Sequence, residues 1–140
     1  MLEKSCGTIP YTIKDGCVYY LLIKAEDNGT CGFPKGHVEE GESEAETALR
    51  ETWEETSIKP VIKKGFRYEI SYPLQNGNEK TVVYFLAEFQ NQVPTRNAGF
   101  EKYAYLLLPF EKATVSLSFE SARLMLKTAN DFLTNRNTFM

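Results

Sequence analysis

The chain has 140 residues, of which 42% are hydrophobic, and its formal net charge at pH 7 is −3. This length suits one domain with a sizeable core, over residues 1–140, and the mild acidity disfavours binding of long nucleic acid. The apolar runs are too short to span a bilayer, and three cysteines without metal-ligand spacing fit reduced thiols, so we expect a soluble, cytoplasmic monomer.

Five stretches have the β-branched and aromatic content of strands. They are Thr8–Lys14, Val18–Lys24, Phe66–Tyr72, Thr81–Phe89 and Tyr103–Leu108. Turn residues at Asp15-Gly16 and at Asn76-Gly77-Asn78 follow the first and the third stretch. The pattern therefore predicts two β-hairpins.

A helix is predicted to begin at Glu44. Ser43 followed by Glu46 has the form of a capping box, in which each side chain bonds the other residue's backbone N–H. An apolar stripe follows at intervals of three and four residues, formed by Ala45, Ala48, Leu49, Thr52, Trp53 and Thr56. Pro60 ends the helix soon afterwards.

The opposite side of this helix is acidic, because Glu51, Glu54 and Glu55 fall within about one third of its circumference. Like charges three and four residues apart repel, so we expect a compensating cation. Arg50 can neutralise one carboxylate, and Mg²⁺, which prefers oxygen ligands, suits the others. The alternative is a solvated acidic face.

The acidity is local. Residues 36–58 hold eight glutamates and one arginine, a net charge of −7, which leaves +4 for the rest of the chain. That positive remainder favours a small polyanion as ligand.

Near the end of the chain a second helical stripe is predicted, and we interpret it as core packing rather than a membrane or partner surface. Its members are Phe119, Ala122, Met125, Leu126, Ala129, Phe132 and Leu133. Strands combined with two helices predict a mixed α/β domain.

The motif around the acidic helix resembles the signature of the Nudix hydrolases. Gly36, Glu42, the pair Arg50-Glu51 and the pair Glu54-Glu55 stand at the spacing of that signature, within GHVEEGESEAETALRETWEETSI. Two positions depart from it. Thr52 stands where the family has an aliphatic residue, and Ser57 stands where it has a glycine that favours left-handed backbone.

This resemblance implies a mixed sheet sandwiched between helices and hydrolysis of a nucleoside diphosphate linked to another moiety. It implies that Glu51, Glu54, Glu55 and the carbonyl of Gly36 hold Mg²⁺, with Mn²⁺ as a substitute. Arg50 and Glu42 would hold the loop and the carboxylates in place. We assign catalysis to Glu54, Glu51, Arg50 and Glu101, and the identity of the general base stays open.

A finer resemblance lies in GFPKGHVEEGE at residues 32–42 and EKTVVYFLAEF at residues 79–89, which are similar to asymmetrical diadenosine tetraphosphate hydrolases. This branch often has threonine at the position of Thr52. It implies that Lys35 and Lys80 meet the polyphosphate. Further substrate-binding candidates are Tyr72, Tyr84, Tyr103 and His37. For Tyr84 simple packing is the alternative, and for His37 we expect loop packing or hydrogen bonding rather than metal ligation.

The functional hypothesis is therefore metal-dependent hydrolysis of a dinucleoside tetraphosphate, which gives ATP and AMP from diadenosine tetraphosphate. One alternative keeps the chemistry and changes the substrate to another capped nucleotide, an RNA 5′ end or a diphosphoinositol phosphate. A second alternative is a nucleotide-sensing module that does not hydrolyse its ligand.

Overall fold

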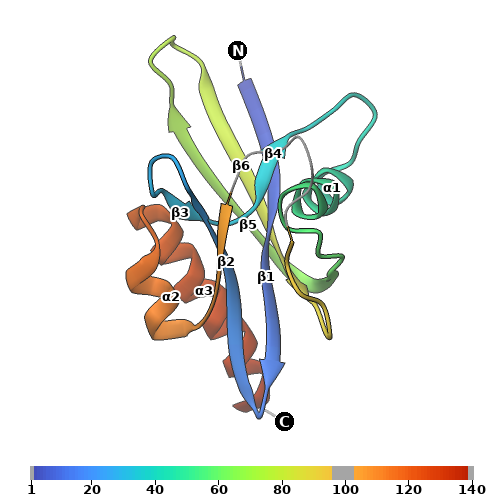
Figure 1. The fold of residues 1–140 in the computed structure, drawn as a ribbon. Helices are drawn as coiled ribbons and strands as arrows, with labels where there is room; N and C mark the ends of the chain where they lie inside the picture. The colour runs from blue at the N-terminus through green and yellow to red at the C-terminus, as the bar shows by residue number, and fades with distance from the viewer. Residues whose placement is uncertain (1, 96–102, 139–140) are drawn as a thin grey trace.

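The computed structural model describes residues 2–95 and 103–138, and within them a mixed sheet lies between helices (Figure 1). The strands are β1 (Leu2–Lys14), β2 (Cys17–Ala25), β3 (Cys31–Gly32), β4 (Lys35–His37), β5 (Val61–Pro73), β6 (Glu79–Glu88) and β7 (Tyr103–Pro109). The helices are α1 (Glu44–Thr56), α2 (Phe110–Ser116) and α3 (Glu120–Thr138). The predicted mixed α/β class is confirmed.

The sheet is organised around β1. It pairs in parallel with β6 from Leu2–Glu79 to Tyr11–Glu88, and antiparallel with β2 and with β4. The turn at Asp15-Gly16 joins β1 to β2, and β5 joins β6 through the second predicted turn, so both predicted hairpins are confirmed. β1 begins six residues earlier than its sequence pattern indicated, because the pairing with β6 continues to Leu2.

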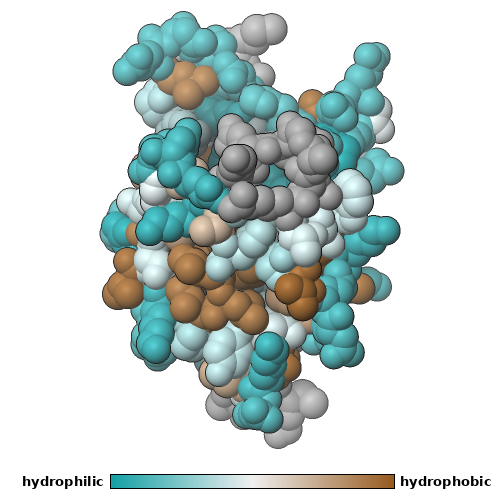
Figure 2. Space-filling view, in the orientation of Figure 1, coloured by the Kyte–Doolittle hydropathy of each residue, from teal (hydrophilic) through white to brown (hydrophobic). Residues whose placement is uncertain are grey.

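Two apolar layers hold the helices to the sheet. On one face, Ala48 of α1 packs with Cys6 and Val83. The other face carries the main core, to which Met125 and Leu126 of α3 contribute. Figure 2 shows hydrophilic residues over most of the upper part of the molecule, where the β5–β6 hairpin ends, and apolar residues gathered lower down.

The C-terminal stripe is buried as predicted at Met125, Leu126 and Ala129, but the prediction is wrong for Phe119. Phe119 precedes α3, and its side chain is 59% exposed. None of the helices in the described ranges is both long and apolar enough to cross a membrane.

The strand β4, which was not predicted, brings the start of the motif against β1. Gly7 makes this close approach possible, because a Cβ on Gly7 would overlap the carbonyl oxygen of Pro34. Cys6 is paired with Gly36 and Ser5 with His37. The loop that leads into α1 is thereby fixed beside the sheet.

Candidate active site

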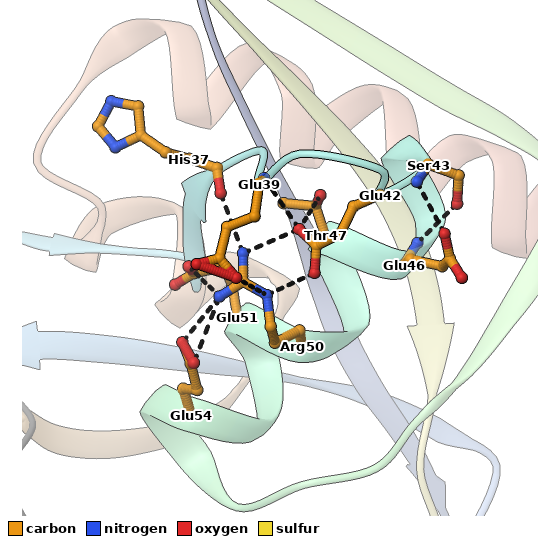
Figure 3. Close-up of polar contacts among 9 residues, drawn as sticks. All are labelled: His37, Glu39, Glu42, Ser43, Glu46, Thr47, Arg50, Glu51 and Glu54. Atoms are coloured by element: carbon orange, nitrogen blue, oxygen red, sulfur yellow. Dashed lines mark hydrogen bonds and ion pairs between the residues drawn. The ribbon is translucent and has the colours of Figure 1, made fainter.

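Helix α1 begins and ends as its sequence predicts. The Ser43 hydroxyl accepts a hydrogen bond from the Glu46 N–H at 3.1 Å, and the Glu46 carboxylate accepts one from the Ser43 N–H at 2.8 Å (Figure 3). The last helical residue is Thr56, and Ser57 follows in the left-handed region with φ of 61°. The capping box is confirmed, and Ser57 adopts the conformation for which glycine is favoured.

The face of α1 opposite the acidic side is fixed to β1 by hydroxyl groups. Thr52 is fully buried, and its hydroxyl donates to the Ala48 carbonyl at 2.8 Å and lies 2.6 Å from the Thr8 hydroxyl. An aliphatic side chain at this position would leave Thr8 without that partner. The pair fixes the rotation of α1 on β1, and with it the direction of its acidic side.

Arg50 is the centre of the acidic side of α1. Its Nε and Nη2 donate to both carboxylate oxygens of Glu42, at 2.7 and 3.1 Å, and Nη2 also donates to the His37 carbonyl at 3.0 Å (Figure 3). This fork holds the loop of residues 37–42 against the helix. The Arg50 guanidinium lowers the pKa of Glu42 to about 2, so Glu42 is ionised at neutral pH.

The remaining nitrogen of this guanidinium joins two of the predicted metal ligands. Arg50 Nη1 lies 2.8 Å from a Glu51 oxygen and 3.0 Å from a Glu54 oxygen. Two carboxylates therefore converge on one cationic group. Burial raises the pKa of Glu51. The Arg50 cation acts in the opposite direction, because a positive charge beside a carboxylate favours its ionised form.

Gly36 gives the Glu51 carboxylate its place beside β4. A Cβ built on Gly36 would overlap the carboxyl carbon and both oxygens of Glu51. A side chain of any size at this position would therefore displace the carboxylate. β4 and α1 are therefore in contact at two of the predicted metal ligands, Gly36 and Glu51.

Glu55 lies at the edge of the same group. Its Oε1 accepts a hydrogen bond from the Lys35 N–H at 3.3 Å, which ties it to β4. Its backbone carbonyl lies 2.8 Å from the hydroxyl of Tyr105, a residue of β7 that was not among the sequence candidates. Tyr105 gave no signal in the sequence, because its role depends on how β7 is placed beside the end of α1.

The donor set matches the chemistry of a hard divalent cation, since the carboxylates of Glu51, Glu54 and Glu55 and the carbonyl of Gly36 all offer oxygen. Over residues 2–95 and 103–138, no three His, Cys, Asp or Glu side chains are grouped closely enough to hold a metal ion. Arg50 Nη1 bonds both Glu51 and Glu54, so these two carboxylates meet at a cationic group of the protein itself. The metal role of these residues thus stays a prediction. The oxygen atoms they offer fit it, and so does the lack of a side chain at Gly36, which leaves room for the Glu51 carboxylate.

A second cluster lies on the sheet next to this group. Lys80 is 7% exposed, and its Nζ lies 3.1 Å from His37 Nε2. His37 Nε2 is also 3.9 Å from the Glu3 carboxylate, and the register places Lys80 between Glu3 and Tyr72 on neighbouring strands. Burial lowers the pKa of Lys80, and the charge of Lys35 acts in the same direction.

The structure thus gathers four predicted substrate-binding residues around one end of the sheet, and we call them the basic cluster: Lys35, His37, Tyr72 and Lys80. Tyr72 is 43% exposed, which leaves ring surface open to a ligand. Glu3, which was not predicted, joins the cluster through the parallel β1–β6 pairing. In Figure 3 the ring of His37 points away from the carboxylates, while its carbonyl faces Arg50.

Three other candidates have different surroundings. Tyr84 belongs to the main core, is 7% exposed and packs edge-on against Phe33, and burial raises its pKa. Its packing explains its position without a ligand. Tyr103 begins β7 and is paired with Ala25. Glu101 lies outside the described residues, so its proposed role stays a prediction.

The comparisons with known proteins agree with the motif. A family model described as NUDIX domain matches residues 8–128. The chain is 34% identical over 144 residues to the asymmetrical bis(5'-nucleosyl)-tetraphosphatase of Rattus norvegicus and 35% identical to that of Mus musculus, in each case over 95% of this chain and 97% of the relative. A solved binary complex of Caenorhabditis elegans Ap4A hydrolase is similar in fold, with a TM-score of 0.85, 26% identity, and coverage of 95% of this chain and 98% of that one.

Proposed function

The chain belongs to the Nudix family, and we propose that it hydrolyses dinucleoside tetraphosphates asymmetrically, giving ATP and AMP from diadenosine tetraphosphate. One observation supports this substrate above all. A carboxylate group suited to a divalent cation lies next to a cluster that contains Lys35, Lys80 and an exposed tyrosine ring. The similarity to asymmetrical bis(5'-nucleosyl)-tetraphosphatases along nearly the whole chain supports the same assignment.

The carboxylates of Glu51, Glu54 and Glu55 and the Gly36 carbonyl would hold Mg²⁺. When bound, such a cation neutralises phosphate charge and lowers the pKa of water. Arg50 positions these ligands, because it is fixed to Glu42 on one side and bonds Glu51 and Glu54 on the other. With a cation bound, the fork to Glu42 would still hold Arg50 beside the carboxylates of Glu51 and Glu54.

The basic residues provide the second half of the site. Lys35 and Lys80 are point charges for the phosphate oxygens, and their mutual repulsion falls when an anion lies between them. Tyr72 offers a ring on which a base can stack, at the end of β5 opposite Lys80. The substrate would therefore extend from α1 across the end of the sheet.

In the reaction, a water oxygen forms a bond to one phosphorus and the bridging P–O bond of the anhydride breaks. The electron pair of that bond leaves with the departing nucleotide. A glutamate of the α1 group accepts the proton of the attacking water. The products are ATP and AMP when the cleaved anhydride bridge lies between the first and the second phosphorus, counted from one adenosine.

The test is product analysis with purified protein and Mg²⁺, using diadenosine tetraphosphate, a capped RNA and a diphosphoinositol phosphate in separate reactions. ATP plus AMP that disappear with EDTA would support the proposal. Turnover of another substrate alone would refute the substrate and keep the chemistry. Saturable binding without metal-dependent product would instead indicate a nucleotide-sensing module.

Matched variants test the roles of the residues. Glu54→Gln and Glu55→Gln should each lower kcat by at least about 10²-fold with the fold intact. Glu40→Gln is the control, because Glu40 is an exposed glutamate of the same motif. Normal turnover in both helix variants would refute the metal assignment.

A further inference from the structure

Ser5 is a buried polar residue with no role in the hydrolysis proposed above. Its side chain is 1% exposed, and its hydroxyl oxygen is the only buried side-chain N or O atom without a hydrogen-bond partner in residues 2–95 and 103–138. Buried hydroxyls nearly always have a partner, because an unpaired one lowers stability. The unpaired hydroxyl of Ser5 therefore calls for an explanation.

The sheet register places this hydroxyl at the border between the core and the basic cluster. Ser5 is paired with His37 on β4 and with Val82 on β6. Paired residues direct their side chains to the same face of a sheet, and Val82 and Ile9 on this face belong to the main core. Going from Ile9 towards the N-terminus on this face of β1, Ser5 is thus the first polar side chain beyond the core.

The contact between Lys80 and His37 passes over β1 at this level. His37 lies on one side of β1, paired with Ser5, and Lys80 lies on the other side, paired with Glu3. Their side-chain nitrogens approach to 3.1 Å, although a whole strand separates their backbones. The pair therefore bridges β1 next to the Ser5 hydroxyl.

We propose that Ser5 is a positioning residue for the substrate and that its hydroxyl donates a hydrogen bond to an oxygen of the polyphosphate chain. This inference rests on the proposed function, which brings a polyphosphate to Lys35 and Lys80. A phosphate oxygen is a stronger acceptor for the Lys80 ammonium than an imidazole nitrogen. When Lys80 turns to the phosphate, its bridge to His37 opens and Ser5 gains access to the ligand.

Ser5→Ala distinguishes a role in ligand binding from a structural role by the sign of the change in melting temperature. Ser5→Ala removes an unpaired hydroxyl, so the melting temperature should stay the same or rise. Loss of a donor to the ligand should raise KM for diadenosine tetraphosphate about 5- to 10-fold, with kcat within about twofold. A lower melting temperature with a proportional loss of kcat would instead show a structural role and refute the inference.

A binding experiment separates this inference from the proposed activity. Inorganic tripolyphosphate in EDTA is the probe, and proton NMR follows the imidazole signals of His37, the single histidine of the chain. Tripolyphosphate should shift these signals in the wild type, and Ser5→Ala should raise its Kd about 5- to 10-fold even if no dinucleotide is hydrolysed.

The control for the binding experiment is Ser71→Ala, since the Ser71 hydroxyl has a partner, Thr81, at 3.0 Å. This variant should bind tripolyphosphate like the wild type. Equal Kd values for Ser5→Ala and the wild type, or no binding by the wild type, would overturn the role of Ser5. Hydrolysis of diadenosine tetraphosphate in that case would leave the proposed function standing.

Discussion

Replacing Gly36 with alanine would place a methyl group where the Glu51 carboxylate lies, since all three carboxylate atoms would overlap the new Cβ. The backbone of β4 is tied to β1, so the side chain of Glu51 has to move. Its bond to Arg50 Nη1, now 2.8 Å long, would break. We therefore expect both stability and activity to fall.

The expected magnitude combines two effects. Overpacking a well-packed site costs about 1–3 kcal/mol, and a hydrogen bond to a charged group contributes about 1.5–3 kcal/mol. Because the Glu51 side chain relaxes partly, we expect the free energy of unfolding of Gly36→Ala to fall by about 2–3 kcal/mol. For a domain of this size the melting temperature should fall by about 5–10 °C. Displacement of Glu51 should lower kcat at least about 10²-fold.

Gly32→Ala is a matched control, because a Cβ on this strand glycine would meet no atom within 4 Å. Removing backbone freedom from the unfolded chain should make Gly32→Ala neutral or up to about 1 kcal/mol more stable. Urea unfolding and calorimetry of both variants give the comparison. If Gly36→Ala is as stable and as active as Gly32→Ala, the packing of Glu51 against β4 is wrong.

Three further predictions follow from contacts of α1. Arg67 and then Lys4 lower the pKa of Glu44 to about 2, below its ordinary value of 4.5, so ionised Glu44 stabilises the fold above about pH 4.5 and this contribution is lost as pH falls towards 2. Glu44→Gln should therefore cost about 1–2 kcal/mol at pH 7, after solvent screening, and much less at pH 2; a difference in urea midpoint that does not change with pH would refute this. Ser57→Gly should raise the free energy of unfolding by a few tenths to about 1 kcal/mol, because φ is 61° at this position, and an unchanged urea midpoint would contradict the strain. Arg50→Lys should lower stability by about 2 kcal/mol and turnover at least about 10-fold, because one ammonium cannot replace the guanidinium fork; wild-type calorimetry and kcat would refute it.

Local patterns in the sequence were enough to predict α1 and its surroundings. The capping box at Ser43 predicted the start of the helix. The apolar stripe predicted most of its buried side, but it is wrong for Trp53, which is 42% exposed, and it missed the buried Thr47. Both patterns depend only on residues close together in the chain. The two hairpins follow from turn residues for the same reason. The fork between Arg50 and Glu42 agrees with the positioning role that the family resemblance implied.

Features that depend on long-range pairing were beyond the sequence. The strands β3 and β4 are two and three residues long, too short for any alternation to show. The placement of Glu3 beside Lys80, and of Tyr105 beside Glu55, requires strands far apart in the chain to be neighbours. α2 was missed, since its seven residues follow β7 without a side-chain cap.

The parallel pairing of β1 with β6 also has a consequence for folding. It joins Leu2 to Glu79, and closing so long a loop costs more chain entropy than forming the β1–β2 hairpin. We expect the hairpin and α1 to form early and the β1–β6 pairing late, so that the basic cluster is assembled after the acidic helix. In pulse-labelling hydrogen exchange during refolding, the backbone amides of β6 that face β1 should gain protection after those of β2, and simultaneous protection would contradict this order. A chain released from synthesis would then assemble the acidic group of α1 before the basic cluster at the end of the sheet.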